Sequence, residues 1–158
     1  MPTESPSGRA ETEAERLDRN LTELLAELRV AITGVQVLFA FLLIVPFNTR
    51  FTELSDPQRY LYLVSLLGAG AATVALVAPI AQHRATFRLQ DKHYVVRSGN
   101  RFALAGLGCL AVSMAAAVTL VTSAVFGTLA GILCAAGATL VFGLCWGLIP
   151  FARRRAVR

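Results

Sequence analysis

Apolar and polar positions alternate in long blocks along the chain. Four runs without a charged residue cover residues 30–47, 60–80, 102–121 and 125–149. The first run has eighteen residues, and at 1.5 Å per residue a helix of that length measures about 27 Å, close to the roughly 30 Å of a bilayer core. The pattern therefore predicts four transmembrane helices and not a soluble core.

The first apolar run continues a helix that is expected to begin well before it. Thr12 followed by Glu15 fits a capping box, which predicts a helix start at this point. Apolar residues then recur at alternating steps of four and three, without a break at Glu27 and Arg29, which is the spacing of a packed helix seam. We expect one helix over residues 13–46, with its first four turns outside the membrane. The predicted seam consists of Leu17, Leu21, Leu24, Leu28, Ala31, Val35, Leu38 and Leu42.

Changes in composition divide the chain into three parts. Residues 1–11 are rich in Ser, Pro, Gly and Glu, a composition that predicts disorder. Residues 12–151 are expected to form the transmembrane domain, and residues 152–158 a basic tail. Asp56-Pro57 is typical of a helix cap with proline at the first helical position, and a charge-free turn is expected near residues 122–128. The predicted fold is all-α, an integral membrane four-helix bundle with an N-terminal cytoplasmic helical extension of the first helix.

The distribution of basic residues predicts the orientation. The chain is 55% hydrophobic, and its fifteen Lys and Arg against ten Asp and Glu lie outside the apolar runs. Lys and Arg number two in the first loop, five in the middle loop, none in the third loop and four in the tail. The positive-inside rule then places the middle loop and both termini in the cytoplasm. Because this excess flanks membrane segments, we expect it to meet anionic lipid headgroups and not nucleic acid.

Small residues predict how the last two helices pack. The fourth run has a small residue at every fourth position, including Gly127, Gly131, Gly143 and Gly147. The third run repeats the spacing at Ala105, Cys109, Ser113 and Ala117. Such ridges allow helix backbones to approach closely in lipid. We expect the third and fourth helices to pack on each other through these ridges, and a dimer surface on the fourth helix is the alternative.

Residues that would carry chemistry are few. The apolar runs hold no ionisable acid or base, and Thr33 and Gln36, three residues apart, form a candidate polar membrane face. A residue such as Gln36 serves either an interhelical hydrogen bond or the lining of a pathway. His83 and His93 have no cysteine or acid pair beside them to complete a metal site. We therefore expect no enzymatic activity, no metal and no cofactor.

Opposite charges are expected to meet on the cytoplasmic side. Residues 4–29 carry a net charge of −3, and the middle loop, residues 81–101, carries +4. Opposite charges near a low-dielectric surface attract more strongly than in bulk water. We expect the extension of the first helix to lean on the middle loop, with Arg29 reaching lipid headgroups. This predicted charge collar consists of Glu23, Glu27, Arg29, Arg84, Arg88 and Arg101.

Three stretches of sequence carry a resemblance to a known family. They read "ELRVAITGVQVLFAFLLIVPFNTRF", "APIAQHRATFR" and "SGNRFALAGL". The chain resembles, from Leu21 to Phe151, a family of small bacterial membrane proteins with four predicted helices and no assigned function. The resemblance implies a multi-pass protein of the bacterial plasma (inner) membrane and assigns no active-site residue.

Two functions from different classes agree with these features. The first is a non-enzymatic accessory or interaction subunit, with a second copy or another membrane protein as its partner. The second is a small transporter or channel component of the ion-antiport kind, acting as an oligomer with Thr33 and Gln36 facing a pathway.

Overall fold

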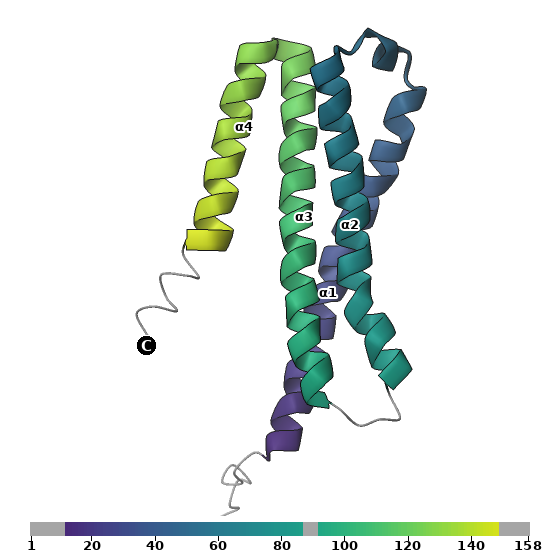
Figure 1. Cartoon of the computed structure of the whole chain (residues 1–158), viewed down its shortest axis with the longest axis vertical. Helices are drawn as coiled ribbons and strands as arrows, with labels where there is room; N and C mark the ends of the chain where they lie inside the picture. Colours follow the sequence, from purple (N-terminus) through teal and green to yellow (C-terminus); the bar gives the residue numbers. More distant parts are fainter. Residues whose placement is uncertain (1–11, 87–91, 149–158) are drawn as a thin grey trace, which may run out of the picture.

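The computed structural model describes residues 12–86 and 92–148, and its secondary structure there is helical (Figure 1). The long helices are α1 (Glu13–Ile44), α2 (Asp56–Thr86), α3 (Lys92–Phe126) and α4 (Thr128–Phe142). Two short 3-10 helices, η1 (Val45–Phe47) and η2 (Thr49–Glu53), join α1 to α2, and a π-helical turn, η3 (Gly143–Leu148), continues α4. Four helices are long and apolar enough to cross a membrane, which confirms the predicted all-α fold. The predicted disordered segment and basic tail lie outside the described residues.

The start of α1 matches the prediction. The backbone N–H of Thr12 donates to Oε2 of Glu15 at 2.8 Å, and the backbone N–H of Glu15 donates to the Thr12 hydroxyl at 3.3 Å. Hydrogen bonds from the Thr12 backbone and hydroxyl lower the pKa of Glu15 below its ordinary value, because they favour the ionised carboxylate. This reciprocal capping fixes the first turn of the helix.

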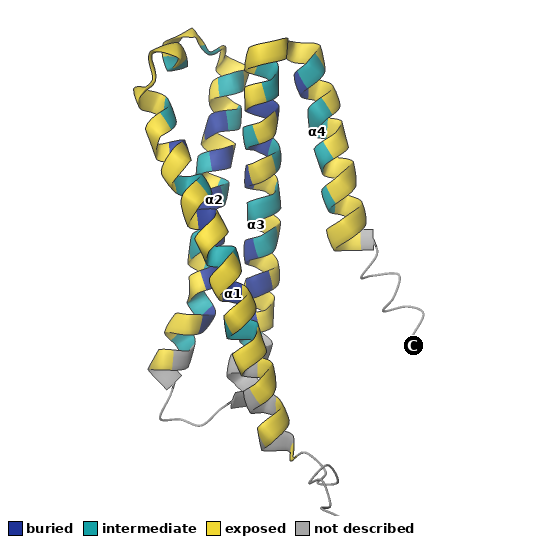
Figure 2. Cartoon of the chain, turned by 180° about the vertical axis from the view of Figure 1, so that it is seen from behind, coloured by how far each residue is buried: buried dark blue, intermediate teal, exposed yellow. Residues whose placement is uncertain are grey.

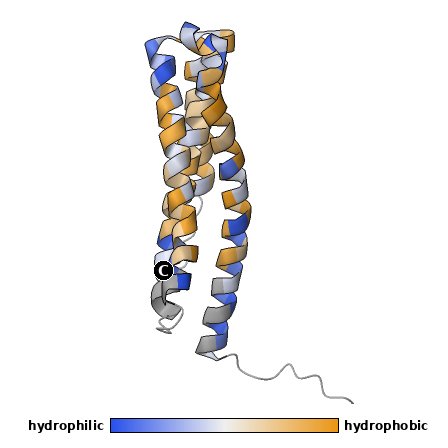
Figure 3. Cartoon of the chain, turned by 90° about the vertical axis from the view of Figure 1, so that its right-hand side faces the viewer, coloured by the Kyte–Doolittle hydropathy of each residue, from blue (hydrophilic) through white to orange (hydrophobic). Residues whose placement is uncertain are grey.

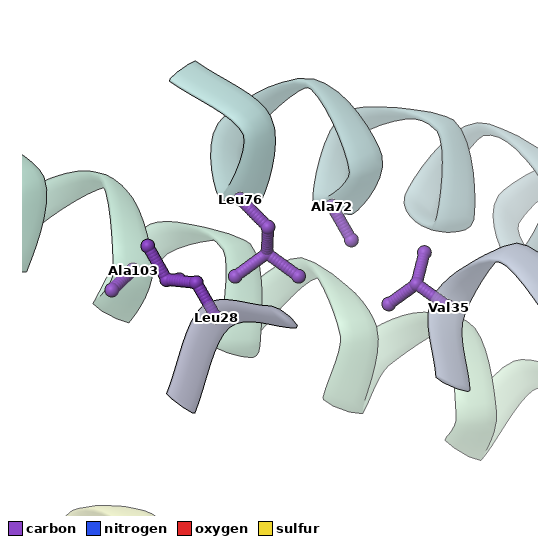
Figure 4. Packing of buried hydrophobic residues seen from close by; sticks show 5 residues of the cluster. All are labelled: Leu28, Val35, Ala72, Leu76 and Ala103. Carbon is purple, nitrogen blue, oxygen red and sulfur yellow. The ribbon is translucent and has the colours of Figure 1, made fainter. Parts of the chain in front are cut away.

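The predicted seam of α1 is its buried face. Leu28, Val35 and Leu42 are 3%, 0% and 4% exposed, and the seam residues between them are half-buried. Figure 4 shows Leu28 and Val35 beside Ala72 and Leu76 of α2, with Ala103 of α3 completing the cluster. The side chains at the first two seam positions lie outside the described part of the chain. The seam therefore packs α1 against both of its neighbours.

Helix α1 ends at Ile44, two residues before the predicted end at 46, and two other helix boundaries also differ from the prediction. The turn between the third and fourth helices lies at Gly127, within the stretch 122–128 near which it was expected, but α3 continues through Phe126 and α4 begins at Thr128, later than the predicted 125. Gly127 has a φ of +88°, which glycine adopts without a Cβ clash. At the second boundary, Asp56 is already helical and the N–H of Ser55 donates to Oε1 of Gln58 at 3.0 Å. The cap of α2 thus lies one residue earlier than predicted.

The basic segment between the second and third spans is largely helical. Helix α2 runs to Thr86, past Pro79, and α3 begins at Lys92. The predicted spans 60–80 and 102–121 are therefore inner parts of longer helices. Figure 3 shows hydrophobic positions over the middle of the helices and hydrophilic positions at the end formed by η1 and η2.

The four helices do not contribute equally to the core. Helices α1, α2 and α3 pack together, whereas among the described elements α4 contacts α3 and its own continuation η3. Figures 1 and 2 show α4 standing beside α3, on the side away from α1. Gly131 is the buried residue of α4. The architecture is thus a three-helix core with a fourth helix attached along one side.

Candidate functional site

The candidate polar membrane face points away from the core. Thr33 and Gln36 are both exposed on α1, on the side opposite the buried seam. The Thr33 hydroxyl donates to the backbone carbonyl of Arg29 at 3.0 Å, so its hydrogen-bonding needs are met within the helix. The side chain of Gln36 makes no hydrogen bond to any residue in the described part of the chain. The two residues therefore line no path between the helices of one chain.

Gln36 is notable because of its depth. The apolar span of α1 covers Thr22–Phe47, and Gln36 lies near its middle. It lies eight positions before Ile44 at the helix end, which corresponds to about 12 Å along the helix axis. A primary amide offers two donors and an acceptor, and leaving these unsatisfied in hydrocarbon costs free energy. A partner outside this chain would remove that cost.

Other polar groups in the bundle are satisfied internally. The Ser65 hydroxyl of α2 donates to the carbonyl of Ser113 in α3 at 2.9 Å, and the Ser113 hydroxyl donates to the carbonyl of Ser65 at 2.6 Å. Both serines are fully buried. Gly68 makes this approach possible, because a Cβ at that position would lie 3.1 Å from Cβ of Ser113. Helices α2 and α3 thus meet through a paired, hydrogen-bonded contact.

This contact corrects the predicted use of the small ridge on the third helix. Ser113 and the backbone of Cys109 face Gly68 of α2, and not α4 as expected. The small residues 68–72 of the second helix had been left open between packing within the chain and a dimer surface. A signal for packing within the chain exists, because Ser65, Ala69 and Ala72 recur at steps of four and three on one face.

The ridge on the fourth helix divides into two halves. A Cβ at Gly131 would lie 2.7 Å from Cβ of Ser123 and 3.2 Å from its Cα, so α4 is in close contact with α3 there. Around Gly143 and Gly147 no atom of the described residues lies within 4 Å of an added Cβ. The expected packing between the last two helices therefore holds near the Gly127 turn and ends before η3.

The predicted charge collar is not held by ion pairs among the described residues. Glu23 pairs with Arg19 of its own helix at 3.8 Å, and the structure places no ion pair between Glu23 or Glu27 and Arg84 or Arg101 in the described ranges. Both acids and the two arginines are exposed, as is Arg29. Arg88 lies outside the described residues.

The extension of α1 nevertheless leans on α3. A Cβ at Gly99 would lie 2.9 Å from Cδ2 of Leu24 and 3.5 Å from Cβ of Pro79. Three helices therefore meet at this glycine, and Glu23, Glu27 and Asn100 line a small cavity of about 250 Å³ beside it. The contact rests on apolar packing, with the two acids at its edge.

The described residues hold no group of three or more His, Cys, Asp or Glu side chains placed to bind a metal. Cys109, Cys134 and Cys145 are free thiols. The side chains of His83 and His93 lie outside the described part. The expectation of no metal and no cofactor stays a prediction.

The four candidate spans define a helical membrane protein. The exposed amide of Gln36 lies on the side of this protein that faces away from its own core. The chain belongs to DUF6328, a family of unknown function whose model matches residues 10–150. This match confirms the resemblance to a family without an assigned function. No curated protein and no solved structure matches the chain.

Proposed function

We propose that this chain is a non-enzymatic, multi-pass protein of the bacterial plasma membrane that acts as an interaction subunit. It would associate side by side with a helix of another membrane protein or of a second copy. The observation that carries this proposal is Gln36, an amide without a hydrogen-bond partner among the described residues, on the outer face of α1 at the middle of its span.

The surroundings of Gln36 suit a helix partner. Thr33 and Ala40 each lie about one turn from Gln36 along α1, and both are exposed on the same face as Gln36. Small side chains on an outer face allow another backbone to approach, and a hydrogen bond between helices in lipid contributes about 0.6 kcal/mol on average. An association of this kind needs no nucleophile, base, metal or cofactor.

The first test is crosslinking within intact membranes. A photo-reactive residue at Ala40 is expected to give a discrete protein adduct, and Gln36→Leu should reduce that adduct about threefold, because 0.6 kcal/mol corresponds to that ratio. Val112→Leu, at an exposed position of α3, is the matched control and should leave the adduct unchanged. If position 40 labels only lipid, or if both variants behave alike, the proposal is wrong.

Both termini are proposed to be cytoplasmic. The start of α1, the end of α2 and the start of α3 lie at one end of the molecule, and η1 and η2 lie at the other (Figure 1). A reporter enzyme that is active only outside the cytoplasm should be silent when fused after Arg158 and active when inserted after Thr52. If the reporter fused after Arg158 is active, the C-terminus lies outside the cytoplasm and the proposed orientation is wrong.

A small transporter or channel component is the second candidate. The observation that favours a transporter is that Thr33 and Gln36 share an exposed face of α1. In an oligomer this face would turn towards the central axis. Purified chain in proteoliposomes would then show cation-dependent flux, and Gln36→Leu would abolish that flux. Flux that Gln36→Leu abolishes would favour this candidate over the interaction subunit, whether or not position 40 gives a protein adduct.

A further inference from the structure

A groove of about 640 Å³ lies at the end of the bundle formed by η1 and η2. Figure 2 shows α1 and α3 diverging towards this end, with α2 behind them. The groove is lined by residues of α1, η1, η2, α2 and α3. Its volume falls within the roughly 300–1,000 Å³ of pockets that hold small molecules.

The walls and the rim of the groove differ in polarity. Phe41 and Ile44 of α1 and Leu120 and Val121 of α3 line it at the depth of the membrane spans. The polar lining residues are Asn48, Arg50, Glu53 and Gln58, on the connection to α2 and its first turn. A groove with apolar walls in the span and a polar rim beyond it suits an amphiphile that stands parallel to the helices.

The rim carries one free charge of each sign. Arg50 and Glu53 are exposed, and within the described ranges neither side chain has a hydrogen bond or ion pair. The neighbouring Arg59, by contrast, donates to the carbonyl of Thr52 at 3.0 Å and pairs with Asp56 at 3.8 Å. Arg50 and Glu53 are therefore available to a ligand.

The segment that carries these charges is well anchored. The side-chain oxygen of Asn48 accepts the N–H of Arg50 at 3.0 Å, and the Thr52 hydroxyl donates to the carbonyl of Thr49 at 2.9 Å. The ring of Phe51 packs edge-on against buried Tyr62, with centroids 5.1 Å apart. Both charges thus stand on one short helix fixed to the core.

We propose that this groove binds one phospholipid whose zwitterionic headgroup ends in a primary amine. An acyl chain lies along the apolar walls, the guanidinium of Arg50 binds the phosphate, and the carboxylate of Glu53 accepts hydrogen bonds from the ammonium group. A phosphocholine headgroup has no N–H for Glu53, and a phosphoglycerol headgroup has no cation. The charge pair therefore selects phosphatidylethanolamine. The inference is independent of the association through Gln36.

Native mass spectrometry of the delipidated full chain tests this selection. Phosphatidylethanolamine, phosphatidylcholine and phosphatidylglycerol with identical acyl chains are titrated, and the first should bind as a single copy at least fivefold more tightly than the others. Glu53→Gln should remove the preference over phosphatidylcholine. Arg50→Gln should weaken both zwitterionic lipids about tenfold, since a hydrogen bond to a charged group is lost.

A pair of bulky substitutions separates the groove from the general lipid surface. Ala124 lines the groove, whereas Val112 is exposed on α3 outside it. Ala124→Phe should abolish the single tight lipid, and Val112→Phe should retain it. Equal binding of the three lipids, or unchanged binding in both Arg50→Gln and Glu53→Gln, would overturn the proposal. Arg50 and Glu53 lie on an exposed segment. Their variants therefore still test lipid selection if Ala124→Phe does not fold.

Discussion

Gly106→Val is expected to lower the free energy of unfolding by about 1–3 kcal/mol. A Cβ at Gly106 of α3 would lie 2.7 Å from both Cγ and Cδ2 of Leu76. Leu76 is completely buried, and close-packed interiors do not yield without strain. Helices α2 and α3 would have to separate at this contact. Reversible unfolding by dodecyl sulfate in mixed micelles measures the effect.

Two further variants decide whether the clash with Leu76 is the cause. Gly108→Val makes the same change in the same helix at a position with no atom within 4 Å, so it should stay within about 0.5 kcal/mol of the parent. Leu76→Ala removes the side chain that the new valine would strike, so the double variant should cost less than the sum of the two single variants. Additive costs, or equal effects of Gly106→Val and Gly108→Val, would contradict this packing.

The core face of α1 could be predicted from the sequence because its period is long and regular. Leu28, Val35 and Leu42 stand seven residues apart, and a face that repeats over several turns has one geometric solution on a straight helix. Burial at all three positions follows from that repeat. The capping box was predictable for a similar reason, since its two hydrogen bonds are local.

The partner of the small ridge on α3 could not be predicted in the same way. Spacing shows that Cys109 and Ser113 share a face, but it does not say which helix the face meets. Glycine and alanine occur on both chain neighbours of α3. The reciprocal bonds between Ser65 and Ser113 depend on the register between α2 and α3, which no local pattern records.

The end of α3, the charge collar and the groove have equally simple physical explanations. Hydropathy indicates depth in the bilayer but not the direction of the backbone. Because Val125 and Phe126 are apolar, they were assigned to the fourth helix, although they form the end of α3. The charge collar relied on exposed ion pairs, each worth under about 1 kcal/mol. Such pairs do not select one geometry, whereas the apolar contact of Leu24 beside Gly99 does. The groove was not foreseen because Arg50 and Glu53 are single charges in a short loop and form no recognisable sequence motif.

Gly131→Leu and Gly143→Leu are expected to differ sharply, although both lie on one sequence ridge. At Gly131 the added Cβ meets the Cα and backbone N of Ser123 at 3.2 and 3.4 Å, and a backbone cannot turn aside as a side chain can. Because the described part of α4 packs against α3 alone, we expect Gly131→Leu to detach it and cost about 1–3 kcal/mol. Gly143→Leu meets no atom within 4 Å and should leave the stability of the isolated chain within about 0.5 kcal/mol.

The same pair separates contacts within the chain from contacts with a partner. Unfolding in mixed micelles measures the contacts within the chain. The adduct yield from the photo-reactive residue at Ala40, in intact membranes, measures the contacts with a partner. If Gly143→Leu lowers the adduct yield while its unfolding is unchanged, the open half of the ridge belongs to the partner surface. If the adduct is also unchanged, the face around Gly143 and Gly147 meets lipid. Equal stability of the Gly131→Leu and Gly143→Leu variants would show that α4 is not held to α3 through Gly131, because only that position is crowded by a neighbouring backbone.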